Sequence, residues 1–296
     1  MGGSRSPAWA WFDGRLVPFD EARVPLEDRG LQFGESLYEV VALVEGEAFR
    51  LPDHVARMAR GAGELGLHEG VPALPEWYSI AGQLYRREPH RSAILYAQVT
   101  GGTAPRRHVP AERRRPLFFA YLRAFEFPDP GTTAHGITVI TVPETRWRRR
   151  DLKTTMLLPA VVSRREAADR GAEEAIYIGQ DGFVNEGASS NVFVSRGRGV
   201  VTPPATNRLL AGVSTIVVRE ICNELQVPFE THPVTLSDLA SADEVFVAST
   251  TFLLMPVTCL DGRLIGGGKA GPVSLQLAYH FQKRFWAVLD RSKAHR

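Results

Sequence analysis

Short hairpin turns recur along this chain, and they constrain its fold more than any other feature. Strand-like runs are separated by an acidic residue and a glycine at Asp13-Gly14, Glu45-Gly46, Asp181-Gly182 and Asp261-Gly262. Such pairs readily take the positive φ angles that a tight hairpin turn needs. Runs with helical spacing, for example over 53–67 and 74–87, lie between the strand pairs. The pattern predicts a mixed α/β protein with many antiparallel strands rather than a regular βαβ series.

Prolines and glycines gather near the middle of the chain, in the stretch "EFPDPGTTAHG". Such a stretch is typical of a linker between domains. The chain of 296 residues also exceeds the usual size of a single hydrophobic core. We therefore expect a domain over residues 1–126, a linker over 127–135 and a second domain over 136–296.

The composition indicates a globular protein, because 44% of the residues are hydrophobic and 23% are charged. The net charge is only +2, and acids dilute the basic runs "YRREPHR" and "AERRRP", so we expect no nucleic-acid partner. No apolar run reaches the ~18 residues of a membrane span. Cys222 and Cys259 cannot build a disulfide framework, which favours a reducing compartment. We expect a cytoplasmic protein with no membrane partner.

Lysine is scarce, although lysines and arginines together number 35. Lys153 is the only lysine before Lys269, and it follows four arginines in "TRWRRRDLKTT". Unlike arginine, lysine can lose its proton and attack a carbonyl carbon as an amine, and nearby cations favour that neutral form. A plain surface charge is the alternative, but its isolation among arginines favours a chemical role for Lys153.

A lysine that forms an imine commonly works with pyridoxal phosphate, which also needs an acid at its ring nitrogen and a cradle for its phosphate. Glu186, in "VNEGASSNVF", follows a strand and precedes small residues that would let a flat ring approach. "LLAGVST" enters a helix at Val213 and Ser214, whose amides would form an anion site. Thr250 in "ASTT" could add a hydroxyl, and Arg57 a forked charge. Strand-end acids and plain helix caps are the alternatives.

The loop "TGGTAPRRHVP" contains Arg106 and His108, and loops that follow strands often carry functional residues. An arginine beside a histidine suits the binding of a carboxylate, whereas the alternative is an exposed basic loop. The sequence has neither metal-ligand spacing of His and Cys nor a G-x-S-x-G nucleophile elbow. We therefore expect no metal ion.

Five ordered motifs together resemble the fold-type IV pyridoxal-phosphate enzymes, and most closely the D-amino-acid aminotransferases. The motifs are "EDRGLQFGESLYEV", "QVTGGTAPRRHVP", "RWRRRDLKTT", "NEGASSNVF" and "VFVASTT". The resemblance implies a small N-terminal α/β domain and a larger C-terminal domain that has a barrel-like β core and carries Lys153. It also implies a homodimer with the active site near the interface, pyridoxal 5'-phosphate as cofactor, and amino acids and 2-oxo acids as substrates.

The resemblance also assigns roles to individual residues. Lys153 matches the family lysine that forms the Schiff base with the cofactor and moves the proton. Glu186 matches the acid at the pyridine nitrogen, and Ser189 lies near the ring. The phosphate-binding positions are matched by Arg57, Val213, Ser214 and Thr250. The trap for the substrate carboxylate, which reaches the site across the dimer interface, is matched by Tyr38, Arg106 and His108.

The implied reaction is transamination of D-amino acids with a 2-oxo acid acceptor, because Arg106 with His108 resembles the D-specific group. Leu158 favours the same conclusion, since branched-chain aminotransferases typically have a tyrosine five residues after the lysine. Two departures affect the substrate pocket. The D-specific group often has "TRG" where this chain has Thr100-Gly101-Gly102, and Phe252 is bulkier than the expected small polar residue.

Several alternatives stay open at this point. Within the same fold, the chain could be a branched-chain L-amino-acid transaminase, an (R)-amine transaminase or an aminodeoxychorismate lyase. From another class, it could be a non-enzymatic protein that binds anions or nucleic acid through its arginines. That last alternative leaves the isolated lysine unexplained.

Overall fold

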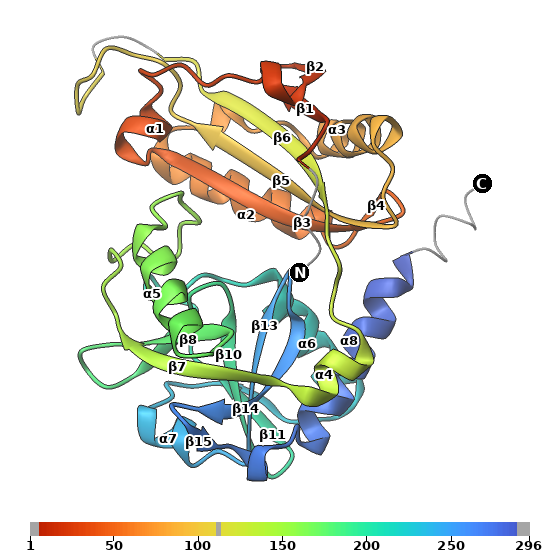
Figure 1. Ribbon diagram of the computed structural model, residues 1–296. Coiled ribbons are helices and arrows are strands. Elements are labelled where there is room, and N and C mark those ends of the chain that lie inside the picture. The colour runs from red at the N-terminus through yellow and green to blue at the C-terminus, as the bar shows by residue number, and fades with distance from the viewer. Residues whose placement is uncertain (1–5, 111–113, 289–296) are drawn as a thin grey trace. The chain divides into compact units, whose positions relative to one another are not determined.

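In the computed structural model, which describes residues 6–110 and 114–288, the chain forms two compact units (Figure 1). The first unit runs to Glu126 and also contains Leu152–Met156 and residues 286–288. The second contains Phe127–Asp151 and Leu157–Phe285. Both units mix strands and helices, which confirms the predicted α/β class. No helix in the described part of the chain is long and apolar enough to span a membrane.

The first unit is built on a six-stranded antiparallel sheet. Its strands, in spatial order, are β2 (Arg15–Pro18), β1 (Trp9–Phe12), β6 (Leu117–Ala124), β5 (Ser92–Thr100), β3 (Ser36–Val44) and β4 (Glu47–Ala48). The helical segments among its described residues are η1 (Phe19–Glu21), α1 (Arg29–Phe33), α2 (Leu51–Leu65), η2 (His68–Gly70) and α3 (Leu74–Arg87).

Successive side chains of each strand point to opposite sides, so this sheet has two different faces. Leu37, Val99 and Phe118 are cross-strand neighbours on the face that α2 and α3 cover. The ring of Trp77 in α3 packs edge-on against Phe118, with 5.3 Å between ring centroids. The opposite face, which neither of these helices covers, carries a row of half-buried aromatic side chains: Tyr38, Tyr96, Phe119 and Tyr121.

The predicted hairpin turns form in both units. Three of them, at residues 13–14, 45–46 and 261–262, have positive φ at both positions, from 48° at Asp13 to 87° at Gly46. Two successive positive φ angles define the turn whose twist matches that of paired strands, and glycine takes such an angle without strain. The fourth pair, Asp181-Gly182, lies in a longer connection between strands. Local turn chemistry therefore determined these hairpins.

Helix α2 (Leu51–Leu65) begins two residues before the helical run predicted over 53–67. Arg50 precedes the helix in the left-handed conformation, and Asp53 lies in the first turn, where it pairs with Arg50 at 2.6 Å. Leu51, Val55, Met58 and Ala62 are buried at helical spacing against the sheet.

The second unit is built on a nine-stranded sheet. Its main path, in spatial order, is β12 (Phe229–Thr231), β11 (Gly199–Thr202), β10 (Asn191–Arg196), β13 (Glu244–Ser249), β14 (Leu253–Leu260), β7 (Ile137–Pro143), β8 (Glu174–Ile178) and β9 (Val184–Gly187), and β15 (Arg263–Leu264) pairs with β14. The helical segments described here are α4 (Pro130–His135), α5 (Leu158–Asp169), α6 (Val213–Glu224), α7 (Leu236–Ala240), η3 (Gly266–Gly268) and α8 (Pro272–Trp286).

This sheet curls back on itself and forms the barrel-like core. β9 ends the path, yet the next strand in the chain, β10, lies in the middle of it. The two strands are joined by a tight turn in which Gly187 N donates to Ser190 O at 2.7 Å. The end of the sheet therefore returns to its middle. Aliphatic side chains such as Val139, Val192 and Met255 fill a buried cluster on this sheet.

The residues expected to form a linker, 127–135, are partly helical. Asp129 caps α4 by accepting a hydrogen bond from Thr132 N at 2.6 Å, and Gln282 of α8 donates to Thr133 Oγ1 at 2.9 Å. Lys153 was expected in the C-terminal domain, but its contacts group Leu152–Met156 with the first unit. The reason is that its backbone pairs with strand β3. The assignment of 1–126 and 136–296 as separate domains stays a prediction.

Candidate active site

Lys153 lies on a short segment that runs beside strand β3 in the first unit. Tyr38 N donates to Lys153 O at 3.0 Å, and an isolated bridge joins Leu37 to Thr154. The lysine side chain is half buried, and its Nζ lies 4.3 Å from the centroid of the Tyr38 ring. Backbone hydrogen bonds and an aromatic surface therefore hold the amine next to Tyr38. Two of the predicted site residues come together here.

Three of the four arginines that precede Lys153 are paired with acids. Arg146 and Arg150 pair with Glu144, and Arg149 pairs with Asp151, all within the second unit. The expectation that these arginines supply unbalanced positive charge to the lysine is therefore not supported. Their charges are balanced by carboxylates of their own unit.

Strand β3 also contributes a buried carboxylate that the sequence reasoning missed. Glu39 is fully buried, and its two oxygens accept hydrogen bonds from Nε and Nη2 of Arg57, both at 2.7 Å. Nδ1 of His54 lies 2.7 Å from the same carboxylate. Burial alone would raise the pKa of Glu39, but Arg57 and His54 lower it to about 2. Glu39 therefore sets the direction of the Arg57 guanidinium, which we expected at the phosphate.

Glu186 lies near the end of β9 in the second unit and is buried. Its Oε1 accepts a hydrogen bond from Nη1 of Arg146 at 2.7 Å, and its Oε2 accepts one from Leu210 N at 2.9 Å. Arg146 also donates to both oxygens of Glu144 and lies over the ring of Tyr177, 4.0 Å from its centroid. Arg146, one of the four arginines that precede Lys153, therefore holds the predicted acid Glu186 in place. No such role for Arg146 was predicted from the sequence.

The turn after Glu186 brings hydroxyl groups onto another buried acid. Ser189 donates to Glu174 from its amide at 3.2 Å and from its hydroxyl at 2.6 Å, and Ser190 Oγ donates to the same oxygen at 3.0 Å. Glu174 is fully buried. These bonds fix the conformation of the turn in which Ser189 lies.

The start of helix α6 is held by residues close to Glu186. Asn191 Nδ2 donates to Leu210 O at 3.1 Å, so the loop before the helix is held through both its N–H and its carbonyl. Val213 and Ser214 are the first residues of α6, and both are buried. Their amides belong to the first turn, where backbone N–H groups have no partner within the helix. The loop that leads to Val213 and Ser214 is therefore bonded to Glu186 through Leu210.

Thr250 lies in the turn between β13 and β14, in the second unit. The register of β10 with β13 pairs Asn191 with Ala248, which brings this turn next to Ser190. Phe252, whose size was unexpected, packs against the core of the unit, and its amide donates to Ser249 Oγ at 3.1 Å. Glu186, Ser189, Val213, Ser214 and Thr250 are thus gathered at one end of the sheet.

Arg106 and His108 are exposed on the loop after β5 and share one neighbour in the first unit. Cζ of Arg106 lies 5.2 Å from the centroid of the Phe33 ring, and the ring centroids of His108 and Phe33 are 5.6 Å apart. Tyr38, the third member of the predicted trap, lies with Lys153 instead. The structure therefore brings two of the three trap residues together.

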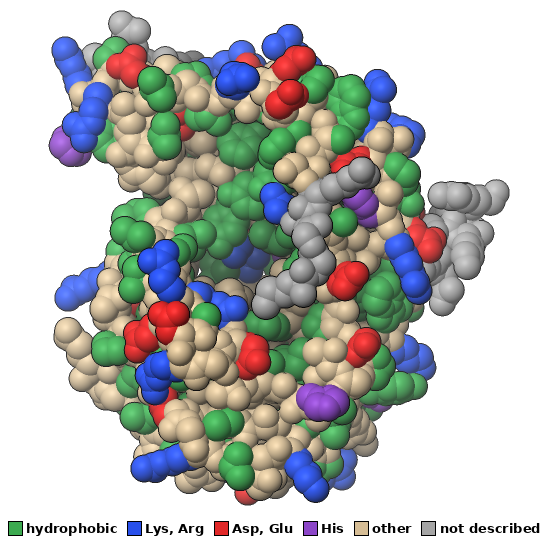
Figure 2. All heavy atoms as spheres, viewed as in Figure 1, with side chains coloured by type: hydrophobic (Ala, Val, Ile, Leu, Met, Phe, Trp, Pro, Cys, Tyr) green, Lys and Arg blue, Asp and Glu red, His purple; other side chains and the backbone are tan. Residues whose placement is uncertain are grey.

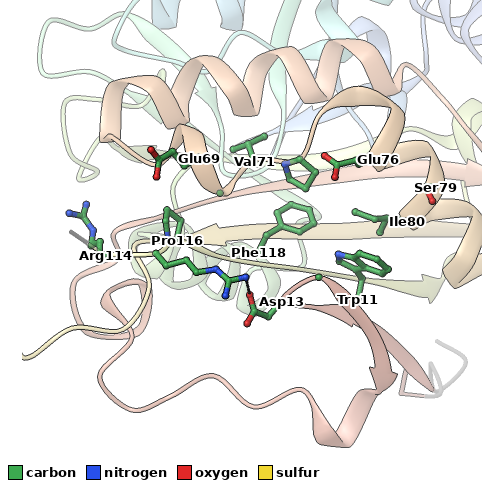
Figure 3. A pocket seen from close by; sticks show the side chains of 14 residues that line it. Trp11, Asp13, Glu69, Val71, Glu76, Ser79, Ile80, Arg114, Pro116 and Phe118 are labelled. Atoms are coloured by element: carbon green, nitrogen blue, oxygen red, sulfur yellow. Dashed lines mark hydrogen bonds and ion pairs between the residues drawn. The ribbon is translucent and has the colours of Figure 1, made fainter. Parts of the chain in front are cut away.

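A cavity of about 650 Å³ lies elsewhere in the first unit, between η2, the start of α3 and strands β1 and β6 (Figure 3). Trp11, Ile80 and Phe118 form apolar walls, and an ion pair between Arg115 and Asp13, 2.9 Å long, borders it. The residues that line it include neither Lys153 nor the other predicted site residues. We therefore do not place the chemistry there.

Charge on the visible surface does not form a single patch. On the face drawn in Figure 2, Lys and Arg side chains are interspersed with Asp and Glu. No group of His, Cys, Asp or Glu suited to a metal ion occurs among the described residues.

Comparison with known proteins gives consistent matches. A family model described as amino-transferase class IV matches residues 36–260. The chain is 38% identical to a D-alanine aminotransferase of Bacillus licheniformis over 89% of this chain and 92% of that protein. It is 34% identical to a D-alanine aminotransferase of Staphylococcus haemolyticus, over 92% and 96% of the two chains.

Solved structures match over nearly the whole chain. The branched-chain amino acid aminotransferase of T.th., solved with pyridoxamine 5'-phosphate, has a TM-score of 0.87 and 25% identity, over 97% of this chain and 95% of that one. A branched-chain amino acid aminotransferase of Escherichia coli has a TM-score of 0.85 at 22% identity, over 95% and 94% of the two chains, a likeness that concerns the fold alone.

Proposed function

Because the chain belongs to the class IV aminotransferases, we propose that it transfers the amino group of a D-amino acid to a 2-oxo acid with pyridoxal 5'-phosphate as cofactor. The observation that carries the proposal is Lys153, whose amine lies over the ring of Tyr38 on a segment hydrogen-bonded to β3. The D-alanine aminotransferases of two bacteria, at 38% and 34% identity, support the choice of a D-amino acid.

The described residues fit this cofactor on structural grounds. A Cβ on Gly187 would lie 2.2 Å from Ser190 Oγ, and a Cβ on Gly212 would lie 1.9 Å from Asn191 Oδ1. The turn after Glu186 and the loop before α6 are thus packed too tightly for a larger residue, which holds the groups proposed to bind the cofactor in fixed positions. The chemical groups also fit the three needs of the cofactor. They are an amine for the aldehyde, a buried carboxylate for the ring nitrogen, and first-turn amides and hydroxyls for the phosphate. When bound, the cofactor supplies an aldehyde carbon for the lysine and a ring that withdraws electrons from the substrate Cα.

The residues of this chain then have distinct tasks. Lys153 would hold the cofactor through its amine, and its free amine would move the proton from the substrate Cα to the cofactor carbon. Glu186 holds a proton on the pyridine nitrogen, and Arg146 keeps the carboxylate of Glu186 in place. The residues proposed to bind the cofactor around its ring and phosphate are Arg57, Ser189, Val213, Ser214 and Thr250.

Tyr38, Arg106 and His108 are proposed to bind the α-carboxylate of the substrate. A guanidinium binds a carboxylate through a planar pair of hydrogen bonds, which fixes its orientation. If Lys153 serves one face of the cofactor, the side on which the carboxylate is held decides which enantiomer presents its hydrogen to the lysine. A carboxylate held by Arg106 with His108 favours D-amino acids.

We further propose that the protein works as a homodimer in the cytoplasm, without nucleic acid or membrane. The aromatic face of the first unit, which α2 and α3 leave uncovered, supports a dimer. So does helix α5 of the second unit, where Leu158, Val161 and Val162 are exposed together with the preceding Leu157. Cys222 and Cys259 are free thiols, as expected in a reducing compartment.

A branched-chain L-amino-acid transaminase is the second candidate, because the solved structures named above are branched-chain enzymes. Their identity of 22–25% is lower than that of the D-alanine enzymes. An (R)-amine transaminase would not need Arg106, and a lyase would turn over without an amino acceptor.

The visible spectrum of the purified protein tests the proposal. A yellow band that is lost on addition of D-alanine, and restored by 2-oxoglutarate, is the expected result. L-leucine is the comparison substrate. Loss of the band with L-leucine alone would keep the cofactor and overturn the D-amino-acid assignment, and a colourless protein that binds no added pyridoxal phosphate would overturn both.

A further inference from the structure

Arg29 is a buried arginine to which the proposed chemistry gives no task. Its side chain is only 5% exposed, at the start of α1. Nη1 donates to Arg107 O at 2.6 Å, Nη2 donates to His108 O at 2.9 Å, and Nε pairs with Glu35 at 2.5 Å. All three guanidinium nitrogens are therefore engaged, and two of them bind the backbone of the loop that carries Arg106 and His108.

Phe33, one turn along α1, extends this contact to the side chains of the loop. The guanidinium carbons of Arg29 and Arg106 lie 4.8 Å and 5.2 Å from the centroid of the Phe33 ring. A cation within about 6 Å of an aromatic face is attracted to it. The ring of His108 contacts the same phenylalanine. The backbone and both side chains of the loop are thus tied to a single short helix.

That helix is itself fixed to the sheet. Asp28, which is fully buried, caps α1 by accepting from Gly30 N at 2.8 Å, and it also accepts from Thr100 Oγ1 at 2.6 Å. Arg29 N donates to Gly102 O at 2.9 Å. Since Thr100 ends strand β5, Arg29 projects from a rigid base onto the loop that follows the same strand.

The position of Arg29 also accounts for Gly101, where the D-specific pattern often has arginine. A Cβ on Gly101 would lie 3.0 Å from the carboxyl carbon of Glu35 and 3.1 Å from Cβ of Arg29. Arg114 pairs with the second oxygen of Glu35. The pair of Arg29 and Glu35 therefore fills the space that a side chain at position 101 would need.

We propose that Arg29 is a positioning residue for the substrate-carboxylate trap: it holds the carbonyls of Arg107 and His108 so that the side chains of Arg106 and His108 face the carboxylate. This inference rests on the proposed function. Arg29 itself is assigned no contact with the substrate, because its side chain is only 5% exposed and each of its three nitrogens is bonded within the protein.

Steady-state kinetics of the holoenzyme with D-alanine test the proposal. In Arg29→Gln, the loss of both loop hydrogen bonds is expected to raise KM about tenfold and to change kcat by less than about twofold. Arg29→Lys retains a charge for Glu35 but lacks the planar fork whose three nitrogens reach Glu35 and both carbonyls together, so its KM should also rise. Arg107→Ala is the matched control, since it removes an exposed side chain of the same loop and keeps the carbonyl.

Limited trypsin digestion supplies a readout that does not depend on activity. Arg106 and Arg107 are exposed, so cleavage after them reports how firmly the loop is held. Faster cleavage in Arg29→Gln than in the wild type is expected while the visible cofactor band is retained. If Arg29→Gln does not fold, Phe33→Leu, which removes the shared ring, should raise KM in the same way.

Arg106→Ala separates the two hypotheses. If it raises KM for D-alanine while folded Arg29→Gln has wild-type KM and wild-type cleavage, the positioning role is wrong and the proposed function stands. If Arg106→Ala leaves KM unchanged, the trap is wrong, and the role of Arg29 falls with it. A raised KM in both variants supports both.

Discussion

Arg146 donates a hydrogen bond from Nη1 to Oε1 of Glu186 at 2.7 Å, and the two side chains are only 12% and 8% exposed. The same guanidinium binds Glu144, so one cation serves two buried carboxylates. Burial would lower the pKa of Arg146, but the hydrogen bonds and charges of Glu144 and Glu186 raise it instead. The charge on Arg146 is therefore a permanent part of the site that holds Glu186.

Arg146→Met should lower the free energy of unfolding by about 3 kcal/mol, because removing one partner leaves buried charges uncompensated. Urea denaturation followed by circular dichroism measures the change. Arg196→Met is the control, since its pair with Asp238 is 55% and 37% exposed. Exposed pairs contribute at most about 1 kcal/mol, so equal losses in the two variants would contradict a special role for Arg146.

Lys153→Ala should abolish transamination while the protein still folds, because the proposed role of this lysine is covalent. The rate of 2-oxo acid formation from D-alanine is the measurement, with circular dichroism as the test of folding. Lys269→Ala, at an exposed lysine of the second unit, should keep wild-type activity. Substantial residual turnover in Lys153→Ala would show that another residue supplies the amine.

Gly212→Ala should weaken cofactor binding more than about tenfold, because the new Cβ would lie 1.9 Å from Asn191 Oδ1 and displace the loop before α6. Titration of the apoenzyme with pyridoxal phosphate, followed by absorbance, measures the affinity. Gly63→Ala in α2 is the control, since nothing lies within 4 Å of its Cβ position. That change should instead stabilise the protein by about 0.5–1 kcal/mol. Unchanged affinity in Gly212→Ala would remove this loop from the site.

The buried pair of Glu39 and His54 should make stability fall at acid pH. Burial lowers the pKa of His54 from its usual 6.5, and Arg57 with His54 lowers that of Glu39 to about 2 in spite of burial. Both groups bind fewer protons in the folded than in the unfolded chain, so their contribution is complete above pH 6.5 and decreases as the pH falls. The part due to His54 is lost below 6.5, and the part due to Glu39 between 4.5 and about 2.

His54→Asn should flatten the first part of this dependence, because the amide can keep a hydrogen bond to Glu39 but does not titrate. Urea denaturation of both proteins between about pH 7 and pH 5 measures how the free energy of unfolding changes with pH. This slope is proportional to the difference in the number of protons bound by the unfolded and the folded states. The same slope in the variant and the wild type would assign the dependence to other groups.

Much of the fold could be predicted because it depends on neighbours in the chain. The helix over Leu74–Arg87 forms at the expected residues, and three hairpin turns take the predicted positive φ angles. The isolation of Lys153 and the small residues after Glu186 were also visible in the sequence. Glu39 was not predicted, although a charged residue within the apolar strand "LYEVVALV" was a signal that it needed a buried partner.

The sequence by itself determined the hairpin turns and the longer helices, and singled out the lysine and acid proposed for catalysis, because spacing and residue type act over a few neighbouring residues. The tertiary structure decided which charges meet. Arg29 reaches a carbonyl 79 residues away, Arg146 a carboxylate 40 residues away, and Lys153 joins the first unit through strand β3. Any of the many arginines could have paired with any acid, and only the packing of distant segments selects the partners.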